Sequence, residues 1–597
     1  MRTLTEHVPA VVLAALLSLA GAAAAATTDI ASVPVGSSSA VKPNVVFILD
    51  DSGSMDFEVL LNTNDGAFWW DSTAQTGWES GGEPKYNLPG SASGNWFKYA
   101  YLTPNGCTTD TRRNCDTLGG NAHFAIPPTP QFASLRSAAY NPLYYNPAIR
   151  YQPWAPAYLG GATRTFGDAS PTAARSHPYF GGSSPVTVNL TTTLTSQAGN
   201  WIFVMQPGMV IPGATTAGIT GKRNNGTSWT SVTSDYRIPG GEYWVVSIPY
   251  YPATYWMPDP GCTSGAGCAQ APDGKWLRRY EIKAGNSFPG GRSYSEELEN
   301  FANWFSYARK RKLMLAGASG LVLNQVKGLR AGIVQINSLA GVTMYDANST
   351  SDSQNLRALL GTIYQNPSSG GTPTREALQY VGQQYLNNSS LIQLACQRNN
   401  AFVMTDGFAL VNNSIAVPAY SQSTWGARPP YQTTWKSSLA DIALAYYTIN
   451  LKPALPAGQV PFDVLDTSPA ADRNPNLHMT TYAMTLGTKG TIFNTPAQPA
   501  DPYANPPTWP EPKVDRNPTA VDDLWHATIN SRGLMFDATD PVSVAAKMQA
   551  TINDIIYRSA PQSAVSVSNV NLRAGDNTAF VSSYNLASWF GELGAYP

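Results

Sequence analysis

A short stretch near the start of the chain joins an apolar run to a cluster of oxygen-bearing side chains. Asn44–Leu49 is almost entirely apolar, and Asp50, Ser52 and Ser54 follow it at once. Such a run predicts a strand buried on both faces of a parallel sheet, and these sheets bind ligands at the carboxyl ends of their strands. Because the three side chains alternate, a bent loop would turn their oxygens towards one hard cation such as Mg²⁺, Ca²⁺ or Mn²⁺.

This stretch resembles the D-x-S-x-S signature of von Willebrand factor A domains, where it begins a metal-ion-dependent adhesion site. Short strings of Asp, Ser and Gly also occur in ordinary turns, so the alternative is a strand-ending turn capped by Ser52 and Asp51. The metal interpretation requires further ligands downstream, each after the appropriate element.

A second piece lies in the loop that begins with two glycines at 370–371 and continues through Thr372, Pro373 and Thr374. Glycines permit a tight turn, and proline suits the first turn of the helix that we expect to follow. The resemblance implies that a threonine of this loop donates its hydroxyl to the metal, and the spacing to Ala377 favours Thr372 over Thr374. The alternative is that either threonine caps the helix.

The third piece is Ala401–Thr405, a second apolar run, which ends in Asp406 and Gly407 and is similar to the T-D-G of A domains. The resemblance implies that Asp406 is the last ligand. The full expected set for a divalent cation, Mg²⁺ or Ca²⁺, is Asp50, Ser52, Ser54, Thr372 and Asp406.

Two carboxylates and three neutral hydroxyls would leave a divalent ion only just neutralised. The ion would therefore attract one more anionic oxygen, such as a carboxylate of a partner protein or surface ligand. No nucleophile–base pair or phosphate-binding loop accompanies these residues, so we expect a binding protein and not an enzyme.

The beginning of the chain indicates export. Residues 1–26 combine Arg2, an apolar run and a small-residue end at Ala24–Ala26, which is typical of a signal peptide, and 27–43 reads as a linker. The alternative, a membrane anchor, is disfavoured by the alanine-rich end, and no later stretch is apolar enough to span a bilayer. With 13% charged residues and a net charge of −1, the chain has no electrostatic basis for binding nucleic acid.

The five cysteines suit an exported protein. Cys107 with Cys115, and Cys262 with Cys268, are each close enough in sequence for a local disulfide. Cys396 is left over, and we expect it to be unpaired.

The remaining pattern predicts an α/β fold with a large insertion. Strands and helices alternate over 44–56 and 295–560, which indicates a von Willebrand factor A-like, doubly wound, mostly parallel sheet with helices on both faces. Residues 57–294 are rich in Gly, Ser, Pro and aromatics and read as a β-rich insertion. A long helix is expected after Ser293, and its basic run at 309–312 is interpreted as a solvated face. Residues 561–597 return to β alternation and read as the start of a truncated, propeller-like β domain.

Several stretches together resemble the PilC/PilY-type proteins of bacterial type IV pili. They run from about residue 44 to the end of the sequence: Phe47-Ile48-Leu49-Asp50-Asp51-Ser52-Gly53-Ser54-Met55, Asn141-Pro142-Leu143-Tyr144-Tyr145, Asn300-Phe301-Ala302-Asn303-Trp304-Phe305-Ser306-Tyr307, His478-Met479-Thr480-Thr481, Asp522-Asp523-Leu524-Trp525-His526 and Trp589-Phe590-Gly591-Glu592-Leu593.

The resemblance implies an exported factor that is located at the pilus tip or cell surface. In transit it would be found in the outer membrane or periplasm. It would support pilus assembly, adhesion and twitching motility, with pilins or minor pilins and a carboxylate-bearing host or surface ligand as partners. The alternative is a secreted A-domain module that binds a host or matrix protein and has no connection with pili.

Overall fold

The computed structural model describes residues 41–559, apart from 64, 86–94, 104–122, 181–184, 195–201, 214–217, 225, 408, 410–414, 463–465 and 514–516, and the backbones of three later strands. Cys107 and Cys115 lie outside the described residues. The chain divides into two compact units. The first is Val41–Gln562, and the second contains the three later strands. Among the described residues, none of the helices has the length and apolar character needed to cross a lipid bilayer.

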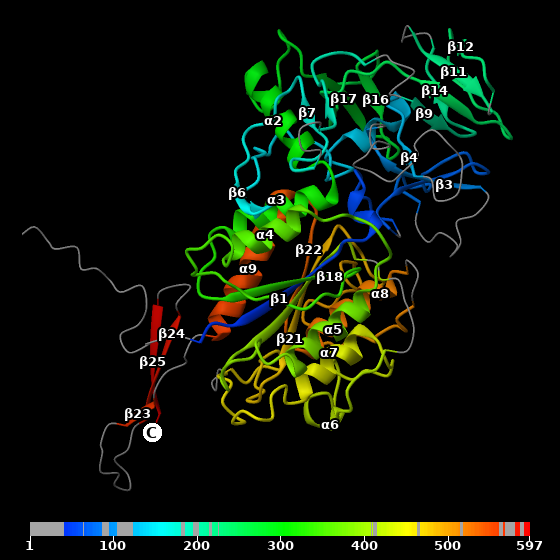
Figure 1. Ribbon diagram of the computed structural model, residues 1–597. Coiled ribbons are helices and arrows are strands. Elements are labelled where there is room, and N and C mark those ends of the chain that lie inside the picture. The colour runs from blue at the N-terminus through cyan, green and yellow to red at the C-terminus, as the bar shows by residue number, and fades with distance from the viewer. Residues whose placement is uncertain are drawn as a thin grey trace, which may run out of the picture. The chain divides into compact units, whose positions relative to one another are not determined.

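The first unit contains a six-stranded sheet in which neighbouring strands come from distant parts of the chain (Figure 1). In spatial order the strands are β19 (Tyr345–Asp346), β18 (Arg330–Gln335), β1 (Asn44–Leu49), β20 (Asn399–Thr405), β21 (Met479–Leu486) and β22 (Met535–Ala538). Strand β1 is parallel to both of its neighbours, whereas β19 runs antiparallel to β18. The carboxyl ends of β1, β20 and β21 therefore meet at one edge.

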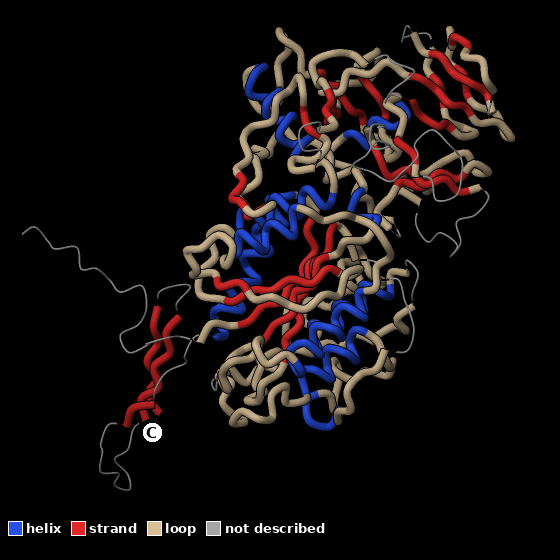
Figure 2. Tube along the Cα trace, viewed as in Figure 1, coloured by secondary structure: helices blue, strands red, loops and turns tan. Residues whose placement is uncertain are grey.

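The side chains of β1 alternate between two hydrophobic cores, because successive residues of a strand point to opposite faces. Val45, Phe47 and Leu49 belong to one core, and Val46 and Ile48 belong to the other. Figure 2 shows helices on both sides of this sheet. The first core contains α3 (Arg311–Leu323), α4 (Leu356–Tyr364) and α9 (Pro541–Ser559), and the second contains α5 (Thr374–Asn387), α7 (Leu439–Thr448) and α8 (Thr519–Asn530). The short α6 (Gln422–Trp425) contacts α7.

The region between β1 and α2 (Tyr294–Tyr307) folds into small sheets around an aromatic core. One has four strands, β12 (Thr230–Ser231), β11 (Thr220–Arg223), β14 (Trp244–Ser247) and β9 (Ile202–Met205). Two have three strands: β2 (Phe68–Asp71), β3 (Trp96–Tyr101) and β4 (Phe124–Ala125), and β15 (Thr254–Pro258), β17 (Trp276–Glu281) and β16 (Cys268–Gln270). The two-stranded sheets are β10 (Val210–Ile211) with β13 (Tyr236–Arg237), β5 (Ala157–Leu159) with β6 (Ala162–Arg164), and β7 (Ala174–Arg175) with β8 (Thr187–Val188). The described residues of this region also form the 3₁₀ helices η1 (Gly53–Asp56) and η3 (Pro130–Arg136).

The predicted fold class is wrong for this chain. We expected a doubly wound, mostly parallel von Willebrand factor A-like fold, but the six-stranded sheet is mixed. Most of the other described strands form small antiparallel sheets. The physical reason is local: the described strands between β1 and α2 are only two to six residues long and lie in a Gly- and Pro-rich stretch, which favours hairpin pairing over crossover helices.

The long helix expected after Ser293 is two helices. Its start has the predicted capping box: Ser293 accepts a hydrogen bond from the Glu296 N–H, and the Glu296 carboxylate accepts one from the Ser293 N–H. Helix α2 nevertheless ends at Tyr307, and α3 begins at Arg311. The extended backbone of Lys310 makes this break and redirects the basic residues that follow it.

In the second unit, β23 (Val565–Val567), β24 (Ala579–Asn585) and β25 (Phe590–Tyr596) form an antiparallel sheet. Backbone pairing joins all seven residues of β24 to β25.

Cys262 and Cys268 form a disulfide whose Cα atoms are 5.5 Å apart, and Cys396 is unpaired among the described residues. Replacing both paired cysteines by serine is expected to lower the free energy of unfolding by about 2 kcal/mol, because the crosslink closes only a short loop. Urea denaturation would measure this, with Cys396→Ser as the control. A double variant as stable as that control would contradict the expectation.

Candidate metal centre at the sheet edge

The first predicted ligands lie where β1 ends. The Asp50 side chain is fully buried, and its Oδ1 accepts the N–H of Ser52 at 2.8 Å. The chain then turns into η1, which brings the hydroxyls of Ser52 and Ser54 to 3.0 Å from each other. The structure therefore gathers these three side chains within one tight turn.

Strand β20 brings a second acidic residue to the same edge. Its parallel register pairs Leu49 with Met404, and the Thr405 hydroxyl donates to Asp50 Oδ2 at 2.6 Å. Asp406 is the next residue and is also buried. Burial of Asp50, reinforced by the negative charge of Asp406, raises the pKa of Asp50 to about 7. Two buried acidic groups that repel each other are an arrangement that a cation would stabilise.

The loop that carries Thr372 contacts the same turn. The Gly53 N–H donates to the carbonyl of Gly370 at 3.2 Å, and Gly370 has a φ of +100°, which favours glycine. Thr372 is buried in the loop, whereas Thr374 is the first residue of α5 and donates its hydroxyl to the Thr372 carbonyl at 3.5 Å. Neither threonine caps α5 through its side chain.

Asn337 and Asp51 hold the two loops together. The Asn337 side-chain amide donates to Asp51 Oδ1 at 3.0 Å and to the Gly371 carbonyl at 2.8 Å. The backbone N–H of Asn337 also donates to Asp51. Asp51 is therefore occupied in positioning the two loops.

One residue of the edge was missed at the sequence level. Arg311, the first residue of α3, donates from Nη1 to Asp406 Oδ2 at 2.7 Å, and both side chains are at most 2% exposed. The expected metal ligand Asp406 therefore already has a cationic partner from the protein itself.

The interpretation of 309–312 as a solvated face is wrong. All four basic side chains are buried, with at most 5% exposed, and each pairs with an acidic residue. Arg309 pairs with Glu58 at 3.0 Å, and Lys310 and Lys312 pair with Asp56 at 3.2 and 2.7 Å. Burial opposes the ionisation of Asp56, but the two lysines lower its pKa below the ordinary value.

The acidic partners lie directly after the D-x-S-x-S turn. Asp56 ends η1, and Glu58 follows two residues later. The sequence signal that could have revealed the pairing was this alternation of acids in an otherwise apolar stretch, because buried charges require partners.

The donor chemistry of the edge fits a hard divalent cation. The residues present carboxylate and hydroxyl oxygens and no thiolate or imidazole, and Mg²⁺ and Ca²⁺ prefer such oxygens. Within the described residues, no group of three or more His, Cys, Asp or Glu side chains could hold a metal ion. Any ion at this edge would therefore depend on two carboxylates supplemented by hydroxyls.

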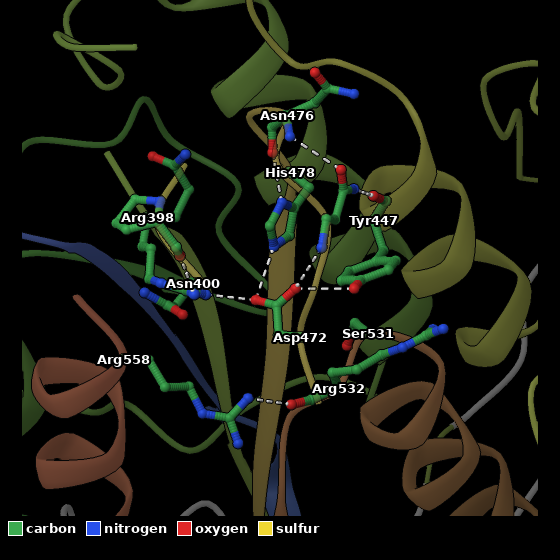
Figure 3. Close-up of polar contacts among 12 residues, drawn as sticks. Arg398, Asn400, Tyr447, Asp472, Asn476, His478, Ser531, Arg532 and Arg558 are labelled. Atoms are coloured by element: carbon green, nitrogen blue, oxygen red, sulfur yellow. Dashed lines mark hydrogen bonds and ion pairs between the residues drawn. The ribbon is translucent and has the colours of Figure 1, made fainter. Parts of the chain in front are cut away.

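A second buried polar cluster surrounds Asp472 at the opposite end of β21, near its first residues (Figure 3). The carboxylate accepts hydrogen bonds from Arg398 and Tyr447, and His478 lies 3.1 Å from it. The Asp472 carboxylate is fully engaged by these protein partners, so we assign the cluster a structural role. It explains the position of His478, one of the motif residues noted in the sequence.

No family model matches the chain. Three relatives from Pseudomonas aeruginosa, all described as type IV pilus biogenesis factor PilY1, are similar to it. The protein of strain UCBPP-PA14 is 26% identical over 390 residues, which is 56% of this chain and 31% of the relative. That of strain PAK is 26% identical over 419 residues, 61% of this chain and 34% of the relative. That of strain PAO1 is 27% identical over 359 residues, 51% of this chain and 30% of the relative.

Among solved structures, the pilus adhesin SpaC from Lactobacillus rhamnosus GG in its open conformation shares 14% identity with a TM-score of 0.21. The match covers 66% of this chain and 47% of SpaC, and at this TM-score it supports no conclusion about fold. The matched regions span about a third of the length of the PilY1 relatives. The three agreeing matches, each over about half of the chain or more, show that this chain is similar to the PilY1 proteins over those regions.

Proposed function

We propose that this protein acts in type IV pilus biogenesis. The observation that carries the proposal is the shared name of the three relatives, each described as a type IV pilus biogenesis factor. Because the similarity spans only about a third of those relatives, the activity of the whole relatives is extended to this chain as a proposal.

The finer part of the proposal is that the protein binds a partner through a divalent cation at the sheet edge. Asp50 and Asp406 would supply the negative charge, and the hydroxyls of Ser52, Ser54 and Thr372 would complete the set of ligands. The gathering of Asp50, Ser52 and Ser54 in one turn, with Asp406 at the end of the neighbouring strand, supports this assignment. When bound, Mg²⁺ or Ca²⁺ would supply an open coordination position for an anionic oxygen.

The partner class follows from this chemistry. A carboxylate of a pilin, a minor pilin or a surface ligand would satisfy the open position, and adhesion and twitching motility would depend on that contact. We propose an exported protein at the pilus tip or cell surface that acts by binding and not by catalysis. The alternative, an adhesive module unrelated to pili, has no support from the relatives' descriptions.

The test is made in the native bacterium. Deleting the gene is expected to reduce surface pili, measured by shearing and immunoblotting of the major pilin. Asp50→Ala in the chromosomal gene is expected to reduce twitching and surface attachment at normal protein levels, because it removes a metal ligand. Asp352→Ala is the matched control, since Asp352 lies in a partly exposed pair with Arg357, away from the sheet edge.

The outcomes separate the two parts of the proposal. Normal piliation in the deletion strain would contradict the pilus role. Wild-type twitching and attachment in the Asp50→Ala strain would contradict metal-dependent partner binding but leave the pilus role intact.

A further inference from the structure

The guanidinium of Arg311 is held in three directions at once. Nη1 donates to Asp406 Oδ2 at 2.7 Å, Nε donates to the Val59 carbonyl at 3.0 Å, and Nη2 donates to the Asp65 carbonyl at 3.0 Å. Only the first of these contacts is to the candidate metal centre. The other two are to the loop that begins the region between β1 and α2, which we call the socket loop and define by Phe57, Val59, Asp65 and Gly66.

The socket loop is shaped around this side chain. Gly66 has a φ of +73°, and a Cβ at that position would lie 2.1 Å from Arg311 Nη2, so only glycine leaves room for the guanidinium. The Phe57 ring lies 5.0 Å from Arg311 Cζ, and the Arg311 N–H donates to the Phe57 carbonyl at 3.2 Å. The position of the positive charge is therefore fixed by the loop as well as by Asp406.

We propose that Arg311 is a built-in counter-cation that lowers the affinity of the sheet edge for a divalent cation and couples cation binding to the socket loop. The inference rests on the proposed metal site. A cation that uses Asp406 must share this carboxylate with a buried guanidinium, and two positive charges a few ångströms apart repel strongly where water is excluded. Cation binding then weakens the Arg311–Asp406 contact, and the guanidinium transmits the change to Val59 and Asp65.

The charge balance gives the expected direction. With both carboxylates ionised, as cation binding requires, they and Arg311 sum to −1, whereas the carboxylates alone would sum to −2 and would neutralise a divalent ion completely. Removing the guanidinium charge therefore strengthens cation binding. Retaining the charge on a different side chain preserves the weaker binding.

The experiment is a calorimetric titration of the full chain with Mg²⁺ and with Ca²⁺. Arg311→Gln is expected to bind at least about tenfold more tightly than wild type, and Arg311→Lys is expected to remain within about threefold of wild type. Arg309→Gln is the matched control, because Arg309 is equally buried but pairs with Glu58, and its affinity is expected to equal that of wild type.

Each outcome decides between the inference and the proposed site. Binding by Arg311→Gln that is equal to or weaker than measurable wild-type binding overturns the inference alone. If Arg311→Gln binds the cation and wild type shows no binding, the result supports the inference. Absence of binding in both proteins overturns the inference together with the proposed metal site.

A second measurement uses only the wild-type protein and so does not depend on the folding of a variant. Hydrogen exchange is followed in peptides that contain Val59 and Asp65, with and without saturating Mg²⁺. Exchange is expected to become faster with Mg²⁺, because the guanidinium loses part of its anchor on Asp406. Unchanged exchange in these peptides, with protection gained in peptides that contain Asp50, would overturn the coupling.

Discussion

Asp472→Asn is expected to lower the free energy of unfolding by about 3–5 kcal/mol, because it leaves the buried guanidinium of Arg398 without its counter-charge. The carboxylate is 2% exposed and also interacts with Tyr447 and His478 (Figure 3). Burial opposes its ionisation, yet attraction by His478 and Arg398 holds the pKa of Asp472 well below its ordinary value. The stabilisation is therefore present above the ordinary pKa of aspartate and is lost as the pH falls through the lower pKa of the folded state.

Urea denaturation followed by circular dichroism measures this effect. Asp352→Asn is the control, because the Asp352–Arg357 pair is partly exposed and is expected to contribute at most about 1 kcal/mol. Equal losses of stability in the two variants would show that the Asp472 cluster does not hold the start of β21 in place.

Asp50→Ala is expected to abolish the stabilisation of the protein by Mg²⁺ and leave its fold intact. A ligand at 100 times its dissociation constant stabilises a protein by about 2.7 kcal/mol, so wild type is expected to unfold at a higher temperature with Mg²⁺. The variant loses hydrogen bonds from Ser52 and Thr405 but is relieved of a buried acidic group that Asp406 repels. Its stability without metal is therefore expected to lie within about 1 kcal/mol of wild type.

Thermal unfolding with and without Mg²⁺ checks this expectation, and two threonine variants test the assignment of the loop. Thr372→Ala is expected to reduce the Mg²⁺-dependent rise in unfolding temperature. Thr374→Ala is expected to leave it unchanged, because Thr374 lies in α5 and its hydroxyl already bonds to a backbone carbonyl. If both threonine variants lose the Mg²⁺-dependent rise in unfolding temperature equally, the ligand threonine was assigned wrongly. If Asp50→Ala keeps the full rise of the wild type, the result contradicts the site itself.

The local parts of the candidate site could be predicted from sequence because each depends on a strand and the residues that follow it. The apolar runs Asn44–Leu49 and Ala401–Thr405 both lie in parallel neighbours of one sheet. Parallel pairing then brings their carboxyl ends to one edge, which is why Asp50 and Thr405 make contact.

The long-range parts could not be predicted in this way. Arg309 and Glu58 are 251 residues apart, and Arg311 and Asp406 are 95 apart, so no local pattern links them. A basic run is ordinarily solvated, and only the break between α2 and α3 turns these side chains inward. The predicted fold class was wrong for a related reason: periodicity marks strands, but it does not reveal which short strands pair as antiparallel hairpins.

Calorimetric titration of purified, metal-free wild-type protein with Mg²⁺ and Ca²⁺ measures whether the sheet edge holds one divalent cation. We expect saturable binding of one ion per chain that Asp50→Ala abolishes. Absence of binding of both ions to the wild type, or equal binding to Asp50→Ala, would contradict it.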